Sequence, residues 1–326
     1  MMGRWNRRAL ALAVVLSLSA GCGRMPTGSP PADATPQALT PIVLGSGQRL
    51  RVLATTSIVG DVVAQIGGAR VDVSSLVPAG VDPHAFEPTP QDVRRVAEAQ
   101  VVFANGLGLE AFLGSLVQSA GTGAPVISVS AEIDPLPAGG PLAATPGGVT
   151  EWDPHVWLDP QNVISWTHVI ESALSALDPQ GAAIYAAGAA AYRAQLQSLD
   201  AEIETTLAAV PPERRRLVTD HEELAYFARR YRFEIVGAVI PAPSAAAEPS
   251  ARELAALEDA IRASGVRAVF VSSVVTPALA RQVAQDTGIK LVTLYAHSLT
   301  SSGGPAPNYL ALMRLDARLI ADALSG

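Results

Sequence analysis

Short apolar runs alternate along the chain with amphipathic segments of helical period. The first unit has an apolar run at Arg51–Thr56, a helical segment at Ile58–Ile66 and a second apolar run at Val71–Val77. Ser57 is expected to cap the helix, because its hydroxyl can accept a hydrogen bond from the free amides of the first turn. Strands that alternate with helices in this way predict α/β units with parallel sheets.

The same alternation continues to the C-terminal end of the chain. Further strands are expected at Val101–Ala104, Val126–Val129, Arg216–Thr219, Glu234–Val239, Ala268–Ser272 and Leu291–Leu294. Further helices are expected at Gln91–Ala99, Leu109–Ser119, Asn162–Ala176, Glu222–Tyr231, Ser250–Ser264, Pro277–Thr287 and Tyr309–Leu324. Residues 131–150 are rich in Gly, Pro and Ala and show neither pattern, which predicts a loop.

One helical segment is much longer than the others. Gln180–Val210 keeps a helical period for about 30 residues, or about 45 Å at 1.5 Å per residue, before two prolines end it. This length predicts two α/β lobes with parallel sheets, joined by one long connecting helix, and a ligand site in the interlobe cleft at the carboxyl ends of the strands. The expected parts are residues 1–21 (signal peptide), 22–47 (lipid anchor and flexible tether), 48–177 (N-terminal lobe), 178–211 (connecting helix) and 212–326 (C-terminal lobe).

The N-terminal segment has the features of an export signal. Three arginines precede the apolar run Ala9–Ala20, which is too short to span a bilayer as a mature helix and is typical of a signal peptide. Leu18–Cys22 resembles a bacterial lipobox, in which the cysteine is lipidated after cleavage. Cys22 is the only cysteine, so no internal disulfide can form. An ordinary signal peptide with an incidental cysteine is the alternative.

The composition excludes some classes of partner. The chain is 49% hydrophobic and 16% charged, as in a globular protein with a large core. It has 30 acidic and 23 basic residues, and removal of residues 1–21 takes away three arginines, which leaves 30 against 20 and a formal charge of −10. This balance disfavours a nucleic-acid partner and mildly favours attraction of cations.

Four of the five histidines fall where such a cleft would form. His84, His155, His221 and His297 follow predicted strands or lie in loops, two in each half of the chain, whereas His168 lies in the middle of a predicted helix. Neutral imidazole binds Zn, Cu, Ni and Fe. The spacing matches no local zinc-finger pattern, so position alone does not identify a metal site.

Several ordered segments resemble the solute-binding proteins of zinc and manganese ABC transporters, and the resemblance covers roughly residues 48 to 324. These segments are Leu76–Asp92, Asn105–Glu110, Asp153–Pro160, Val218–Glu222 with Tyr226–Tyr231, and Tyr309–Arg314. The resemblance implies two α/β lobes joined by a long helix, with a metal ion between them. It also implies a membrane permease of an ABC importer as the partner.

The resemblance also implies which residues bind the metal. His84, His155 and His221 fall on the first three ligand positions. The third position tends to be His in zinc binders and a carboxylate in manganese binders, so His221 favours Zn(II) over Mn(II). The family usually has Asp at the fourth position, where this chain has His297. Either His297 ligates, or it turns away and leaves three histidines and a water molecule; we favour ligation.

Three acids lie close in sequence to the third ligand position. Asp220, Glu222 and Glu223 could accept hydrogen bonds from imidazole N–H groups. The alternative is that they are exposed acids at a helix start, where the helix dipole favours negative charge. Residues 131–150 contain no histidine, unlike the loop of many zinc members, so auxiliary metal capture is not expected there.

We therefore expect a monomeric, extracytoplasmic lipoprotein, anchored to the cell membrane through Cys22, that captures Zn(II) and delivers it to an ABC importer. An adhesin-like surface protein and a binder of chelated metal or another small solute are alternatives. A zinc hydrolase would need an open coordination position and a general base such as Glu222. The chain has no His-Glu-x-x-His motif, so we do not expect an enzyme.

Overall fold

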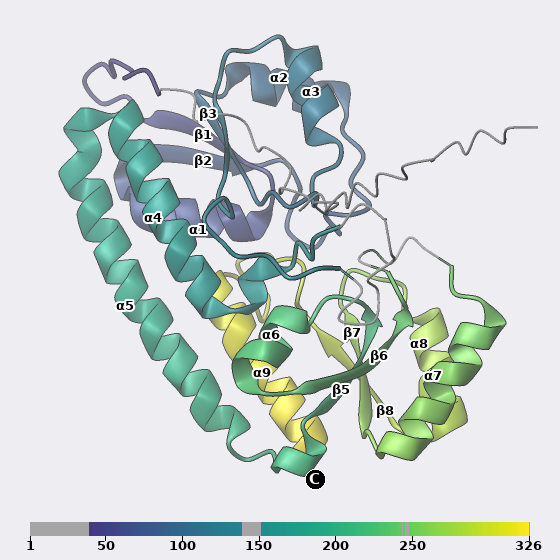
Figure 1. Cartoon of the computed structure of the whole chain (residues 1–326). Helices are drawn as coiled ribbons and strands as arrows, with labels where there is room; N and C mark the ends of the chain where they lie inside the picture. Colours follow the sequence, from purple (N-terminus) through teal and green to yellow (C-terminus); the bar gives the residue numbers. More distant parts are fainter. Residues whose placement is uncertain (1–38, 139–150, 243, 245–247, 326) are drawn as a thin grey trace, which may run out of the picture. The chain divides into compact units, whose positions relative to one another are not determined.

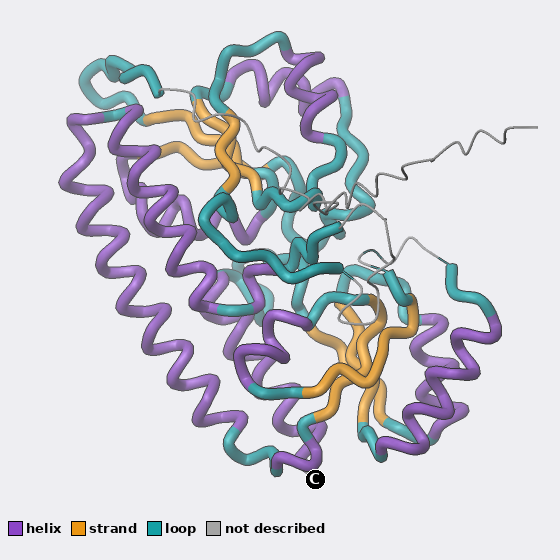
Figure 2. Tube along the Cα trace, viewed as in Figure 1, coloured by secondary structure: helices purple, strands orange, loops and turns teal. Residues whose placement is uncertain are grey.

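The computed structural model describes residues 39–138, 151–242, 244 and 248–325 (Figures 1 and 2). The expected signal peptide, Cys22 and most of the tether lie outside these residues, as do residues 139–150 of the expected loop. Among the described helices, none combines the length and the apolar character that a membrane crossing requires.

The first sheet has four parallel strands in the order β2-β1-β3-β4. Side chains of successive residues point to opposite faces of a strand. Val52 and Ala54 of β1 therefore pack with helices α1 and α4, while Leu53 packs with α2 and α3 on the other face. The strands are β1 (Leu50–Ala54), β2 (Val71–Ser75), β3 (Val101–Ala104) and β4 (Val126–Ser128). The helices are α1 (Ser57–Gly67), α2 (Pro90–Glu98), α3 (Leu113–Ala120) and α4 (Pro160–Leu177).

The second sheet repeats this strand order as β6-β5-β7-β8, again all parallel. Val269 of β7 packs with helices α7 and α8 on one face, and Phe270 belongs to the main core on the other. The strands are β5 (Arg216–His221), β6 (Glu234–Ile240), β7 (Ala268–Ser272) and β8 (Lys290–Leu294). The helices are α6 (Ala225–Tyr231), α7 (Ala251–Ser264), α8 (Ala278–Thr287) and α9 (Tyr309–Ser325). The sequence prediction of two lobes with parallel sheets is confirmed.

Helix α5 (Ala182–Leu207) is the long helix that the sequence predicts, and it packs against helices of both lobes (Figure 1). It contacts α1 and α4 of the first lobe and α9 of the second. At Gly188 a Cβ atom would lie only 2.4 Å from the carbonyl oxygen of Ile66 at the end of α1. The absent side chain therefore permits the close approach of the two helices.

Asp200 on α5 links the two lobes through a buried carboxylate. It accepts hydrogen bonds from Gln161 of α4 (2.7 Å), from Tyr231 of α6 (2.9 Å) and from Arg230 of α6 (3.0 Å). Asp200 is 4% exposed, so it has little water to replace these donors. The position of α6, which follows the strand that ends in His221, thus depends on α5.

Replacement of Asp200 by alanine is expected to lower the free energy of unfolding by about 2–3 kcal/mol. It leaves the buried phenol of Tyr231 without its acceptor and removes the nearest of the three carboxylates around Arg230. Denaturant unfolding of the purified protein measures this. The matched control is Glu202→Ala on the same helix, which removes an exposed ion pair with Arg314 and should cost no more than about 1 kcal/mol. Equal effects of the two changes would contradict the role of Asp200.

Most predicted helix starts differ from the structure by one or more residues, and three of the differences have a clear local cause. The N-cap of α1 is Thr56, whose hydroxyl accepts a hydrogen bond from the amide of Val59 (3.2 Å), and Ser57 is the first helical residue. Helix α3 begins at Leu113, later than predicted, because the residues before it turn around the buried Glu110. Helix α6 begins at Ala225, so the acids after His221 precede the helix.

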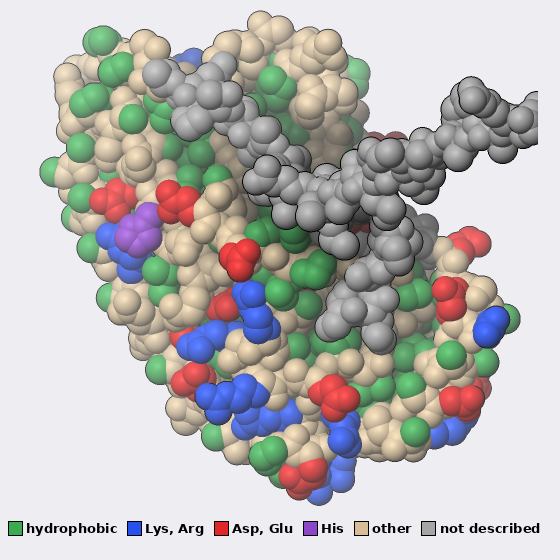
Figure 3. Space-filling view, viewed as in Figure 1, with side chains coloured by type: hydrophobic (Ala, Val, Ile, Leu, Met, Phe, Trp, Pro, Cys, Tyr) green, Lys and Arg blue, Asp and Glu red, His purple; other side chains and the backbone are tan. Residues whose placement is uncertain are grey.

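The two lobes carry unequal charge. Residues 48–177 contain 5 Lys and Arg against 13 Asp and Glu, whereas residues 212–326 contain 13 against 12. On the face shown in Figure 3, the basic side chains gather mainly in the lower part, over the second lobe. The N-terminal lobe therefore provides the negative potential that attracts cations.

Candidate metal centre

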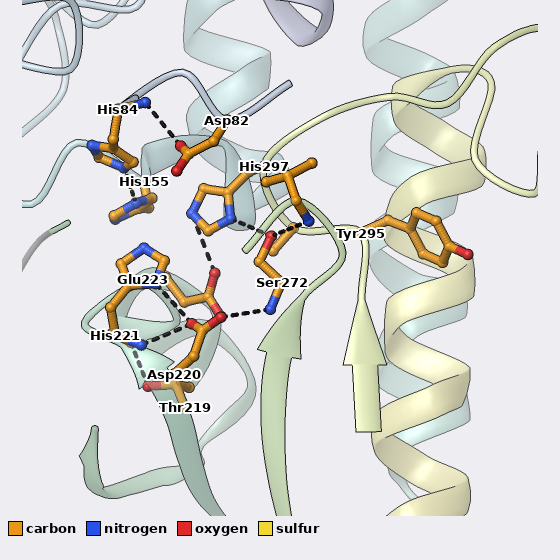
Figure 4. A network of polar contacts seen from close by, with 12 residues as sticks. Asp82, His84, His155, Thr219, Asp220, His221, Glu223, Ser272, Tyr295 and His297 are labelled. Atoms are coloured by element: carbon orange, nitrogen blue, oxygen red, sulfur yellow. Dashed lines mark hydrogen bonds and ion pairs between the residues drawn. The ribbon is translucent and has the colours of Figure 1, made fainter. Parts of the chain in front are cut away.

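Four histidines from four separate segments converge between the two sheets (Figure 4). His84 follows β2, His155 precedes the short helix Val156–Leu158, His221 ends β5, and His297 follows β8. One ring nitrogen of each lies within 4.8 Å of one nitrogen of every other. His155, His221 and His297 are buried, and His84 is partly exposed. The arrangement follows from parallel sheets, whose strands all end at the same edge.

The rings of His155 and His221 are fixed by neighbouring carboxylates. Nδ1 of His155 lies 2.8 Å from Oδ1 of Asp153, and Nδ1 of His221 lies 2.7 Å from Oδ1 of Asp220. An Nδ1–H that donates to a carboxylate leaves the lone pair on Nε2, which is the tautomer that can bind a metal. Both rings are therefore oriented to offer Nε2 to the centre of the cluster.

His297 is oriented in a similar way, by a hydroxyl group. Its Nδ1 lies 2.8 Å from Oγ of Ser272 at the end of β7. On the other side of the cluster, Nε2 of His84 lies 3.0 Å from Nε2 of His155. Two nitrogens that bind one ion at about 2.0–2.1 Å in tetrahedral geometry are about 3.3 Å apart. The cluster therefore has dimensions that fit a single divalent metal ion.

Burial keeps these imidazoles neutral. Desolvation, with a smaller contribution from the neighbouring His221, lowers the pKa of His84 to about 4. The same causes lower the pKa of His155 and the pKa of His297 well below the usual value. A neutral imidazole has a lone pair available for a metal, so no proton has to be removed from these three rings at pH 7.

The three acids near His221 have different surroundings. Asp220 is the acceptor for the His221 ring, and its second oxygen accepts a hydrogen bond from the amide of Ser272 (2.8 Å). Glu222 is partly buried. Glu223 is fully buried, and desolvation raises its pKa well above the usual value. The interpretation of these residues as exposed acids at a helix start is wrong for Asp220 and Glu223. Asp220 is a buried residue of β5 itself, and Glu223 is buried in the turn that follows this strand.

Sequence reasoning missed Asp153, although a signal was present. The tripeptide Asp-Pro-His occurs twice, ending at His84 and at His155. In both copies the aspartate oxygen accepts a hydrogen bond from the histidine amide at 2.9 Å, and at Asp153 it also contacts the ring. The proline between them holds the chain in a turn that brings acid and imidazole together. His168, by contrast, is exposed on α4.

Hydrogen bonds between the lobes hold the loops that carry the histidines. The indole of Trp157, two residues after His155, donates to the carbonyl of Ala296 (2.7 Å), next to His297. The hydroxyl of Tyr309 donates to the carbonyl of Trp157 (2.7 Å). Tyr226 of α6 donates to the carbonyl of Asp153 (3.0 Å). The His155 loop of the first lobe is thus positioned by three side-chain and backbone groups of the second lobe.

The segment Asn105–Glu110 contacts the loop that carries His155 through a hydrogen bond to Pro154. The Glu110 carboxylate accepts hydrogen bonds from the amide of Asn105 (2.7 Å) and the hydroxyl of Thr55 (2.5 Å). The side chain of Asn105 then donates to the carbonyl of Pro154 (3.0 Å). This chain of contacts explains why a segment without histidines is placed next to the metal centre.

Replacement of Asp153 by alanine is expected to weaken the binding of a divalent metal ion about 10–100-fold, because it frees the ring of His155 from its carboxylate. Competition with a chromophoric chelator measures the change. Asp134→Ala is the control, since Asp134 is an exposed acid in the segment before the same loop. An unchanged affinity in Asp153→Ala would show that the carboxylate does not orient a ligand.

Two parallel α/β lobes, one long helix and a histidine cluster between the lobes define a substrate-binding protein of a metal transporter. The sequence matches the family described as "Zinc-uptake complex component A periplasmic" over residues 52–323. The chain belongs to this family, whose members are transport binding proteins and not enzymes.

Known relatives are similar over most of the chain. The manganese-binding lipoprotein MntA of Halalkalibacterium halodurans is 32% identical over 318 residues, which is 97% of this chain and 98% of the relative. The manganese ABC transporter substrate-binding lipoprotein PsaA of Streptococcus mitis is 31% identical, over 86% of this chain and 91% of the relative.

Among solved structures, the cadmium-bound periplasmic metal binding protein of Candidatus Liberibacter asiaticus is similar, with 28% identity and a TM-score of 0.75. That similarity covers 85% of this chain and all of the solved chain. The same Liberibacter protein has also been solved with manganese bound. Together, the family and these relatives identify this chain as an extracytoplasmic, divalent metal-binding substrate protein of an ABC transporter.

Proposed function

We propose that the protein captures one Zn(II) ion with His84, His155, His221 and His297 and delivers it to the membrane permease of an ABC importer. The observation that supports this most strongly is the convergence of four imidazoles with ring nitrogens within 4.8 Å. Four ligands at this spacing suit tetrahedral zinc. The alternative with three histidines and a water molecule is disfavoured, because His297 is buried and directed into the cluster.

The choice of zinc is an inference from ligand chemistry. Imidazole binds late first-row metals more strongly than Mn²⁺, which prefers carboxylate and water ligands. Two relatives are named as manganese-binding, which favours manganese. The four imidazoles of this site favour zinc instead. We expect Zn(II) to bind at least about 100-fold more tightly than Mn(II), in keeping with the order of divalent affinities.

This selectivity can be measured on metal-free protein. Chelator competition for Zn(II) and direct calorimetry for Mn(II) give the two dissociation constants, with one equivalent of metal expected in each case. The same titrations on His168→Ala should reproduce the wild-type values, because His168 is exposed and lies outside the cluster. Equal affinities, or tighter binding of Mn(II), would overturn the assignment to zinc.

Residues 1–21 act, in this proposal, as a signal peptide, and Cys22 carries the lipid that anchors the protein, with residues 22–47 as the tether. Residues 48–177 and 212–326 are the two lobes, and residues 178–211 contain the connecting helix. The support is the lipobox-like sequence before the only cysteine and the lipoprotein relatives.

Replacement of Cys22 by alanine should move the protein from the membrane fraction to the soluble extracytoplasmic fraction, because the residue that carries the lipid is lost. Continued membrane association of this variant would contradict the anchor. We also propose that the protein acts as a monomer and does not bind nucleic acid.

A further inference from the structure

The segment Ala296–Leu299 carries His297 and follows β8 of the second lobe, but its backbone is hydrogen-bonded to the first lobe. The carbonyl of its first residue accepts a hydrogen bond from the indole of Trp157 (2.7 Å), and the amide of its last residue donates to Oγ of Ser57 at the start of α1 (3.2 Å). Both ends of the segment are buried. The first lobe therefore fixes the backbone on both sides of His297.

Ser298 links this segment to the loop that carries His84. Its Oγ accepts a hydrogen bond from the amide of Gly80 (2.8 Å), four residues before His84, and lies 3.3 Å from Oγ of Ser57. Ser298 directly follows His297 and is only 2% exposed, so these contacts form away from bulk water, where hydrogen bonds are stronger. One hydroxyl group thus joins two segments that carry ligands, one from each lobe.

The ring of His297 is held from the opposite side (Figure 4). Its Nδ1 lies 2.8 Å from Oγ of Ser272 at the end of β7, and the ring stacks on the ring of His221 with centroids 4.8 Å apart. Both of these neighbours belong to the second lobe. The backbone of His297 is thus fixed by one lobe while its ring is oriented by the other, so its position depends on the contact between the lobes.

Two other rings of the cluster are oriented within their own segments. Asp153 contacts the ring of His155 from two positions earlier in the same loop. Asp220 contacts the ring of His221 from the preceding position of the same strand. A change in the contact between the lobes should therefore disturb the ring of His297 more than either of these two rings.

We propose that Ser298 is a positioning residue that keeps His297 in the metal site and so slows the release of the captured ion. This inference rests on the proposed function, because it assumes that the four histidines bind the metal. Ser298 acts through the backbone: its hydroxyl group holds the segment against Gly80 and Ser57 of the first lobe while Ser272 orients the ring. Without that hydroxyl group, His297 is the ligand that leaves the ion first.

The test compares Ser298→Ala with wild-type protein. The change should leave the fold intact, because the amide of Gly80 keeps the carbonyl of Leu299 as an acceptor (3.0 Å). We expect the dissociation rate of Zn(II), measured by transfer to an excess of chelator, to rise about tenfold, and the association rate to change less. The control is Ser302→Ala, at an exposed position of the same loop, which should leave both rates unchanged. An unchanged dissociation rate in Ser298→Ala would overturn the proposal.

A second set of variants separates the positioning of His297 from a general loosening of the protein. In a His297→Ala background the ring is absent, so the further change Ser298→Ala should have little effect on the dissociation rate. A rise of equal size in both backgrounds would overturn the role of Ser298, because it would then not act through His297. Ser57→Ala, which removes the other hydroxyl group of the contact, should raise the rate in the wild-type background as well. Failure of the wild-type protein to bind Zn(II) would instead overturn the proposed function itself.

Discussion

Replacement of His155 by alanine should weaken Zn(II) binding by more than about 100-fold. Loss of a partner outside the coordination sphere typically costs 10–100-fold, and loss of a ligand should cost more. His155 is tightly constrained: it is fully buried, Asp153 holds its Nδ1, and its Nε2 lies 3.0 Å from that of His84. No neighbouring side chain in the described structure can take its place, since each of the other imidazoles already faces the centre.

The measurement is a chelator competition carried out with His155→Ala, His168→Ala and the wild type. His168→Ala removes an imidazole from the exposed surface of α4. It therefore shows whether the loss of any histidine, or the purification of a variant, changes the measured affinity for zinc. We expect the wild-type constant for His168→Ala and a much weaker one for His155→Ala. Similar affinities for all three proteins would place the metal elsewhere.

Saturation with zinc should make the folded protein much more stable. A ligand that binds only the native state at 1,000 times its dissociation constant adds about 4 kcal/mol to the free energy of unfolding. For a chain of this size, with an unfolding entropy of about 2.1 cal/mol/K per residue, that corresponds to a rise in Tm of roughly 6–7 °C. The effect is expected to act on both lobes, because each contributes two histidines to the cluster.

Calorimetric unfolding of metal-free and zinc-loaded protein measures this rise. The comparison with His155→Ala separates binding at the cluster from binding at surface acids, since the variant should lose most of the rise while keeping the surface. Magnesium at the same concentration serves as a control, because Mg²⁺ prefers oxygen ligands. A zinc-induced rise of equal size in the variant would show that the ion stabilises another part of the protein.

Local sequence patterns were sufficient to predict the fold. The parallel strands are short apolar runs buried on both faces, as at β3 and β7, and such runs are distinctive when helices separate them. The long connecting helix was evident from its period and the prolines after it. The start of α6 was predicted three residues too early because Glu222–Leu224 have good helical composition, and only contacts with the rest of the site hold them in a turn.

The environment of the site could not be read from local patterns. Burial of Glu223 depends on His297, which lies 74 positions later in the chain, and on the strand order that brings β5 beside β7. Asp153 was within reach of sequence reasoning, since it precedes His155 by two residues. The role of Tyr226 and Trp157 in joining the lobes was not, because both side chains are ordinary core aromatics until the partner loop is known.

The proposed function requires one metal ion between the four histidines. A crystal structure of the zinc-loaded protein, with anomalous diffraction measured on both sides of the zinc absorption edge, tests this position directly. We expect one strong anomalous peak about 2.0–2.1 Å from Nε2 of His84, His155, His221 and His297. A peak elsewhere, or an empty cluster in protein that contains one equivalent of zinc, would contradict it.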